Sequence, residues 1–407
     1  MRDASRLWCE RAVLPTGAAT GVLVEVVDGR LARVQRVAEP PAGVERVAGW
    51  TVPGFVDTHG HGGGGFDYAS TDAVQAQGAR DFHRRHGTTT ALASLVTADL
   101  DTLVAQIGTL APLVRAGELG GIHLEGPFLS PAKRGAHTEA LLRPPTEEAV
   151  DRLLAAGEGT VAMVTLAPEL PGALAATARL VAAGVTVAVG HTDGDEADVR
   201  RALDAGASVA THLFNAMRPI HHRAPGPVPV LLDDERVMVE LIGDGFHLHP
   251  DVVRMAVASA GLDRAALVTD AMVATGMSDG AYSLGSREVT VRRGEARLVT
   301  EDGSAGSIAG STLTMAAGFA FLVRIGMSIP GAAWLAATTP ARRHELPDVG
   351  VVAAGAWADL CVVDGSGRLQ RVMQRGTWVE GAGAAAVRGG PDVDPSEDPG
   401  EGAGGRR

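Results

Sequence analysis

Histidine and carboxylate side chains close several apolar runs in the 407-residue chain, and these residue types are the ones that bind Zn²⁺ and Fe²⁺ in proteins. A single histidine after a strand is more often a hydrogen-bonded structural residue. Six ligand-type side chains at the ends of five runs are harder to explain in that way, so the pattern predicts a metal site. The six residues are His59, His61, Glu125, His191, His212 and Asp270.

Short apolar runs of strand length position these side chains. Alternate residues of a strand face the same side, so His59 and His61 can point into one site. The glycines at 62–65 that follow are expected to keep the mouth of this site free of side chains. Ala- and Leu-rich helical stretches separate many of the runs. The eight predicted strands lie within residues 52–59, 88–96, 120–126, 160–168, 186–192, 208–214, 237–247 and 265–272.

The alternation predicts an α/β fold, a TIM (β/α)8 barrel with a small β-sandwich domain formed by both chain ends. Catalytic groups of such barrels gather at the carboxyl ends of the strands, where the six side chains stand. A doubly wound sheet is the alternative architecture. Both chain ends contain short alternating strands, including a pair joined across Asp28-Gly29, a dipeptide suited to a hairpin turn. The predicted boundaries are 1–52 and 346–380 for the β-sandwich domain, 53–345 for the barrel and 381–407 for a disordered tail.

Composition limits the partners. The chain has 36 basic and 48 acidic residues, a net charge of −12, which disfavours general binding to nucleic acid or an anionic membrane. An anionic substrate must therefore be held by local cations. Cys9 and Cys361 make no disulfide framework, and no run approaches the roughly 20 apolar residues of a spanning helix. We expect a cytoplasmic protein with no nucleic-acid or membrane partner.

Several motifs together resemble the amidohydrolase superfamily and, within it, the family of N-acetylglucosamine-6-phosphate deacetylases. An HxH pair alone indicates only the superfamily, whereas HLEGPF, HLFNAM and LVTDAM in one chain are far more specific. The resemblance extends from the first strands to about residue 380. The matching motifs are PGFVDTHGHG from Pro53, HLEGPFLSPAKRGAH from His123, VGHTDG from Val189, THLFNAM from Thr211, DGFHLHP from Asp244, LVTDAM from Leu267 and SIAGSTLTM from Ser307.

The resemblance implies a divalent-metal cofactor, Zn or Fe, with one or two ions per subunit. Lys133, the chain's single lysine, falls in a loop, so the carboxylated lysine that bridges two ions in many relatives has no counterpart at a strand end. Glu125 takes its place and, with His191 and His212, is expected to hold the principal ion. His59 and His61 are expected to hold a second ion, with Asp270 close to the pair.

The resemblance also implies roles in the reaction. Asp270 is the expected general base and His137 the group that polarises the substrate carbonyl. Arg223, whose fork grips phosphate oxygens, is expected to anchor the substrate's phosphate from a neighbouring subunit, which implies a homodimer. The other implied substrate-binding residues are Ala136, Asn215, Ala216, His247, Ser307, Ile308 and Ala309.

The expected activity is hydrolysis of a small sugar phosphate, N-acetylglucosamine 6-phosphate, to glucosamine 6-phosphate and acetate, in amino sugar catabolism or cell-wall recycling. One alternative is another amidohydrolase that acts on a different N-acetyl amino sugar phosphate or on a cyclic amide. A second is a catalytically silent sugar-phosphate-binding protein. That second reading expects a broken ligand set, whereas Glu125, His191, His212 and Asp270 are all present.

Overall fold

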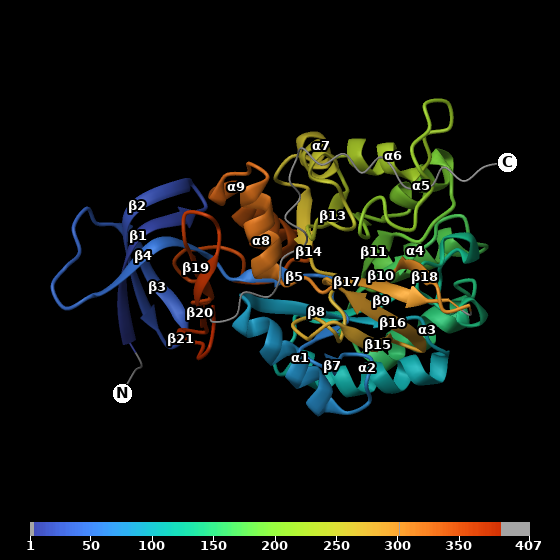
Figure 1. The fold of residues 1–407 in the computed structure, drawn as a ribbon, viewed down its shortest axis with the longest axis horizontal. Coiled ribbons are helices and arrows are strands. Elements are labelled where there is room, and N and C mark those ends of the chain that lie inside the picture. The colour runs from blue at the N-terminus through green and yellow to red at the C-terminus, as the bar shows by residue number, and fades with distance from the viewer. Residues whose placement is uncertain (1–3, 301, 384–407) are drawn as a thin grey trace.

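The central element of the computed structural model is an eight-stranded parallel sheet, and the structure describes residues 4–300 and 302–383 (Figure 1). Neighbouring strands follow chain order, β14-β13-β12-β11-β10-β9-β8-β5. Beyond β5, the backbone N–H of Asp270 donates to the carbonyl of His59 at 2.8 Å, which joins the first strand's extension to the last and nearly closes the barrel. The strands are β5 (Phe55–Asp57), β8 (Thr88–Val96), β9 (Gly121–Glu125), β10 (Val161–Leu166), β11 (Thr186–Val189), β12 (Val209–Ala210), β13 (Met238–Ile242) and β14 (Ala265–Val268).

Each of the eight predicted ranges contains one of these strands, so the barrel prediction is confirmed and the doubly wound sheet is excluded. Helices cover the outside of the barrel and bury one apolar face, as Leu103, Ile107 and Leu110 do in α2. Side chains such as Asp72 and Thr146 accept hydrogen bonds from first-turn N–H groups and so fix where helices begin. The helices are α1 (Ala73–Arg85), α2 (Leu100–Arg115), α3 (Glu147–Gly157), α4 (Ala173–Ala182), α5 (Glu196–Asp204), α6 (Pro227–Asp233), α7 (Pro250–Ala260), α8 (Met315–Arg324), α9 (Ile329–Ala333) and α10 (Thr339–Arg343).

The two chain ends meet in one mixed seven-stranded sheet, in the order β21-β20-β19-β4-β1-β2-β3. Antiparallel pairing of β4 with β19, in register Val52 to Cys361, joins the N-terminal strands to the C-terminal ones. The sheet folds over its own apolar core, because the N–H of Leu31 donates to the carbonyl of Ala356 at 2.8 Å from across the fold. The strands are β1 (Ala4–Leu14), β2 (Gly17–Val27), β3 (Arg30–Arg36), β4 (Glu45–Pro53), β19 (Leu360–Val363), β20 (Leu369–Gln374) and β21 (Thr377–Trp378).

The predicted hairpin between β2 and β3 is present, with Asp28 and Gly29 both at positive φ, as a tight primed turn requires. The domain boundaries proposed from the sequence stay a prediction. The predicted tail lies outside the described residues from position 384 onward. Within the described part of the chain, no helix is long and apolar enough to cross a membrane.

A four-stranded antiparallel sheet, which the sequence analysis did not predict, lies over the barrel (Figure 1). It consists of β15 (Gly280–Leu284), β16 (Arg287–Arg292), β17 (Glu295–Val299) and β18 (Ala305–Ile308). Alternate apolar residues on its inner face, such as Val289, Val291 and Leu298, pack against Met272 after β14. We call this element the mouth sheet.

The glycines after His61 serve close packing at the edge of the barrel. Gly62 and Gly63 form β6 (Gly62–Gly63), which pairs with β7 (Phe66–Asp67). A Cβ on Gly62 would meet the Phe66 carbonyl at 2.3 Å, and one on Gly64, which has a φ of +65°, would meet the Phe82 ring at 2.7 Å. These glycines therefore let the β6–β7 hairpin lie against α1, a different reason from the clear mouth expected from the sequence.

Candidate active site

The inside of the barrel is stacked in layers, because inward side chains recur at every second residue of each strand. The lowest layer is apolar and contains Leu92, Met163, Ala188, Val209, Met238 and Ala266. Two residues further along four of these strands come Ser94, Thr165, Thr211 and Glu240, and His123 joins them through hydrogen bonds to Ser94 and Thr165. The candidate ligands lie above this polar layer, at the carboxyl ends of the strands, as predicted.

One group of candidate ligands consists of Glu125, His191 and His212 from β9 and from the ends of β11 and β12. The Nε2 atoms of both histidines lie 3.0 Å from Glu125 Oε1 and 3.1 Å from each other. All three residues are buried, and their ligand atoms lie within 4.8 Å of one another. This group is the one that the sequence predicted for the principal ion.

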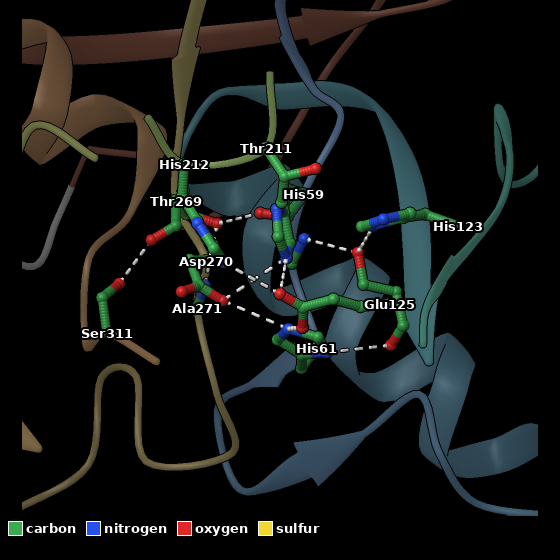
Figure 2. Close-up of polar contacts among 12 residues, drawn as sticks. His59, His61, His123, Glu125, Thr211, His212, Thr269, Asp270, Ala271 and Ser311 are labelled. Carbon is green, nitrogen blue, oxygen red and sulfur yellow. Dashed lines mark hydrogen bonds and ion pairs between the residues drawn. The ribbon is translucent and has the colours of Figure 1, made fainter. Parts of the chain in front are cut away.

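A second group consists of His59, His61 and Asp270, whose ligand atoms also lie within 4.8 Å of one another (Figure 2). His61 Nε2 lies 3.1 Å from Asp270 Oδ1 and 3.1 Å from Glu125 Oε2, whereas His59 Nε2 lies 3.6 Å from each carboxylate. Glu125 therefore faces both groups, one oxygen toward His191 and His212 and the other toward His61. A carboxylate in this position is suited to bridge two cations.

Hydrogen bonds on the far side of the rings fix which nitrogen faces the centre. Nδ1 of His191 lies 2.8 Å from the carbonyl of Lys133, and Nδ1 of His61 lies 3.2 Å from the carbonyl of Ser94. Nδ1 of His59 lies 3.3 Å from the buried carboxylate of Glu240. Because these oxygens only accept hydrogen bonds, each neutral ring carries its proton on Nδ1 and presents the Nε2 lone pair inward.

The centre is thus an array of lone pairs, because imidazole Nε2 atoms face carboxylate oxygens. Nε2 of His59 is buried and has no hydrogen-bond partner among the described residues. Acceptors at about 3 Å from one another repel unless a proton or a metal cation lies between them. The residues present therefore fit a divalent cation.

The electrostatics of the site favour positive charge in the same place. Burial opposes ionisation of His61, but hydrogen bonds and charges from Asp270 and Glu125 outweigh it and raise the His61 pKa to about 9. The same carboxylates raise the pKa of His59 well above its usual value against the effect of burial. Burial also opposes ionisation of Asp270, yet the neighbouring histidines hold the Asp270 pKa at about 2. A cation at the centre would replace these protons.

Three of the candidate metal and catalytic residues have a left-handed backbone, which is uncommon outside glycine. The φ angles of His191, His212 and Asp270 are 47°, 27° and 49°, just beyond the ends of β11, β12 and β14. Such conformations cost of order 1–3 kcal/mol each and persist where neighbouring structure holds them. For Asp270, the N–H of Ser311 donates to its carbonyl at 2.7 Å, and its own N–H is bonded to His59. The backbone is therefore bent to turn these side chains into the barrel mouth.

His137 comes from the loop after β9 and lies over the same centre. The backbone N–H of Thr97 donates to His137 Nδ1 at 3.3 Å, so the proton of the neutral ring resides on Nε2. Nε2 lies 3.5 Å from Glu125 Oε2. Burial lowers the His137 pKa to about 4, although Glu125 acts in the opposite direction. His137 is therefore a neutral hydrogen-bond donor, the reverse of the ligand histidines.

A cavity of about 370 Å³ opens onto the centre, between the barrel and the mouth sheet. His247 faces it and has its Nδ1 2.6 Å from Asp244 Oδ2; burial lowers the His247 pKa, but Asp244 reverses this and leaves it raised. Seven of the nine predicted substrate-binding residues line the cavity, namely Ala136, His137, Asn215, Ala216, His247, Ser307 and Ile308.

The other two predicted substrate-binding residues lie outside the cavity. Arg223 is on an exposed loop, with Nη1 2.6 Å from His222 Nε2, and does not reach the cavity of its own chain. Ala309 is fully buried behind the wall, among the apolar residues under the mouth sheet.

Three residues of the site were not identified from the sequence. Glu240 is fully buried and bonded to Thr58 and His59; a carboxylate inside the apolar run VMVELI was the available signal. Thr97 orients His137 through its backbone, which leaves no signal in a side-chain pattern. Arg287 lines the cavity from β16, and its inward direction depends on the unpredicted mouth sheet.

The comparisons with known proteins agree with this geometry. The Amidohydrolase family model matches residues 50–387. A Mycobacterium smegmatis N-acetyl-D-glucosamine-6-phosphate deacetylase variant, solved in complex with N-acetyl-D-glucosamine-6-phosphate, is 45% identical, with a TM-score of 0.89 over 92% of this chain and 99% of that chain. An N-acetylgalactosamine-6-phosphate deacetylase of Escherichia coli O157:H7 is 34% identical over 88% of this chain and 93% of its own length. An N-acetylglucosamine-6-phosphate deacetylase of Vibrio furnissii is 34% identical over 81% of this chain and 82% of its own length. The chain belongs to the amidohydrolase family.

Proposed function

We propose that the chain is a metal-dependent deacetylase that hydrolyses N-acetylglucosamine 6-phosphate to glucosamine 6-phosphate and acetate. The observation that carries the proposal is the convergence of Glu125, His191 and His212 beside Asp270, at the base of a cavity that holds most of the predicted sugar-phosphate residues. The 45% identical relative solved with N-acetyl-D-glucosamine-6-phosphate supports the same substrate.

Two sets of residues would hold the cofactor, which we propose to be Zn²⁺ or Fe²⁺. Glu125, His191 and His212 would hold the principal ion, and His59 and His61 a second one, with Glu125 between them. A divalent ion bound there lowers the pKa of its water toward neutrality and polarises a carbonyl oxygen.

Asp270 is the proposed general base. Its low pKa keeps the carboxylate ionised at neutral pH, and its side chain lines the cavity. It accepts a proton from the water that attacks the acetyl carbon, and it delivers that proton to the sugar nitrogen as the C–N bond breaks. The products are the free amine and acetate.

His137 is the proposed donor to the acyl oxygen. Its neutral ring presents Nε2–H toward the centre because the N–H of Thr97 occupies Nδ1. A fixed donor at this position stabilises the negative charge that develops on the oxygen as water attacks.

The far end of the cavity is the proposed phosphate site. His247, whose raised pKa favours its cationic form, and the backbone at Asn215 and Ala216 line that end. The sugar lies against Ala136 and the segment 307–309. Arg223, exposed on its loop, is proposed to reach the phosphate of a second copy in a homodimer.

The proposed compartment is the cytoplasm. Cys9 and Cys361 are free thiols, both buried, and burial raises the Cys9 pKa to about 11. A thiol held in its protonated form reacts slowly with oxidants. Because neither cysteine forms a disulfide, the fold does not need an oxidising compartment.

A test measures acetate release after chelation and after addition of Zn²⁺ or Fe²⁺. We expect stoichiometric release that stops on chelation and returns with metal. Failure of metal-loaded protein to release acetate would defeat the proposal. The E. coli relative favours one second candidate, N-acetylgalactosamine 6-phosphate, so both epimers belong in the substrate panel.

A further inference from the structure

A second cavity of about 340 Å³ opens beside the catalytic one, between the loop after β9 and strands β16 to β18. We call it the side chamber. Ala132, Gly135, His137, Arg287 and Ser307 line both cavities, so the two spaces adjoin along a shared wall. None of the proposed reaction steps places a substrate or product group in the side chamber.

The side chamber lies at the acyl end of the site. Of the proposed metal and catalytic residues, only His137 lines it. Asn215, Ala216 and His247, at the proposed phosphate end, line the catalytic cavity alone. The side chamber therefore adjoins the catalytic cavity beside His137, the proposed donor to the acyl oxygen.

The wall of the side chamber is positively charged. Among the described residues it includes two arginines and no carboxylate. Arg134 is paired with Glu139 at 3.1 Å, which offsets its charge. Arg287 pairs with Leu284 through its backbone. Its guanidinium has no hydrogen bond or ion pair with any described residue. Its charge is left to attract an anion, and a guanidinium can bind both oxygens of a carboxylate.

The register of β16 directs Arg287 inward. Arg287 shares a strand face with the buried Val289 and Val291, which pack beneath the mouth sheet, and it is itself half-buried. The turn before it is fixed, because Ser286 Oγ lies 2.8 Å from Thr138 Oγ1 in the loop after β9. A cation on the apolar face of a strand is unfavourable unless water or an anion solvates it.

We propose that the side chamber binds the carboxylate product of the reaction, acetate, and that Arg287 is its binding group. The inference rests on the proposed function, which forms acetate beside His137. The amide carbon becomes the carboxylate as the C–N bond breaks, so a new anion arises at the shared wall. Acetate then leaves past Arg287.

The test is product inhibition by sodium acetate and by glucosamine 6-phosphate, at constant ionic strength, in the metal-loaded enzyme. Arg287→Gln should raise the acetate inhibition constant by about tenfold, which corresponds to the loss of about 1.4 kcal/mol of binding free energy. Its inhibition constant for glucosamine 6-phosphate should not change. Arg292→Gln, an exposed position on the opposite face of β16, is the matched control and should match wild type in both.

Two outcomes would overturn the proposal. Equal acetate inhibition of wild type and Arg287→Gln would assign acetate binding to the metal centre. Arg287→Gln could instead raise the KM for N-acetylglucosamine 6-phosphate and the inhibition constant for glucosamine 6-phosphate, and leave the inhibition constant for acetate unchanged. That result would assign Arg287 to the phosphate.

A second measurement does not depend on turnover. Line broadening of ¹³C-labelled acetate by the resting, metal-loaded protein should be present in wild type and Arg292→Gln and strongly reduced in Arg287→Gln. Equal broadening in all three contradicts the side-chamber site. Failure of the proposed function is distinguishable, because it would abolish acetate release in wild type itself.

Discussion

Replacing Glu240 by Gln should weaken the metal site proposed at His59 and His61 while sparing the one proposed at Glu125, His191 and His212. Glu240 is fully buried below the ligands; one carboxylate oxygen accepts from Thr58 at 2.8 Å and the other lies 3.3 Å from His59 Nδ1. Glutamine keeps the shape but has a single acceptor oxygen. Either Thr58 or His59 then loses its acceptor, and the charge that favours His59 as a ligand is lost.

The expected magnitude follows from this loss. Removing the carboxylate behind a ligand histidine costs about 10- to 100-fold in metal affinity, or roughly 1.4–2.7 kcal/mol. If the amide NH₂ turns toward His59, the ring proton moves to Nε2, which blocks ligation and places the effect at the upper end. Glu125, His191 and His212 make no hydrogen bond to the Glu240 side chain, so the principal ion should be retained.

The assay is titration of Zn²⁺ against a competing chelator, with elemental analysis after buffer exchange. Wild type should retain more metal per chain than Glu240→Gln under conditions that strip only the weaker ion. Glu235→Gln, an exposed carboxylate shortly before β13, is the control and should bind as wild type does. Unchanged affinities in Glu240→Gln, or earlier loss of the principal ion, would refute the reasoning.

Three further predictions concern single carboxylates. Asp270→Asn should reduce kcat by about 10²–10⁴ and retain the principal ion, as seen by steady-state kinetics with elemental analysis; unchanged turnover would remove Asp270 as the base. Asp244→Asn should lower the pKa of His247, so that His247 loses its positive charge at a lower pH than in wild type. As pH is increased, the KM for the phosphorylated substrate should therefore begin to rise at a lower pH in the variant. Superimposable KM profiles from pH 6 to 9 would speak against a phosphate role for His247. Burial raises the pKa of Asp359 to about 6, although the N–H of Arg375 lowers it in part. Wild type should therefore lose up to about 3 kcal/mol of unfolding free energy relative to Asp359→Asn as pH rises from about 4 to 6, because only the unfolded chain ionises freely there. Urea unfolding at each pH measures this, and a pH-independent difference would disprove it.

The barrel, and the grouping of the candidate ligands at its mouth, were predictable because two local signals coincide. Each barrel strand is a short apolar run, and five of the eight runs end in a histidine or a carboxylate where the strand reaches the barrel mouth. His123, which begins the HLEGPF motif, is fully buried and bonded to Ser94 and Thr165. Such positions can be predicted from the two-residue period of a strand and the chemistry of a single side chain.

The rest depended on contacts between distant segments. β16 has alternating polar and apolar residues between glycine turns, a pattern typical of a strand, but only its packing on Met272 shows that Arg287 faces inward. The Nε2 of His83 in α1 lies 2.8 Å from the carbonyl of Gly62 and fixes the hairpin after the HxH pair, a contact that the helical pattern of α1 does not indicate. The role proposed for Arg223 would need a second copy of the chain, which no single-chain pattern describes.

The most direct test of the central claim is an anomalous difference map from crystals of the protein loaded with Zn²⁺. We predict a peak about 2.0–2.2 Å from a Glu125 oxygen and from the Nε2 atoms of His191 and His212. A map without a peak between these three side chains, from protein that nevertheless releases acetate, would contradict the metal centre on which the proposed reaction depends.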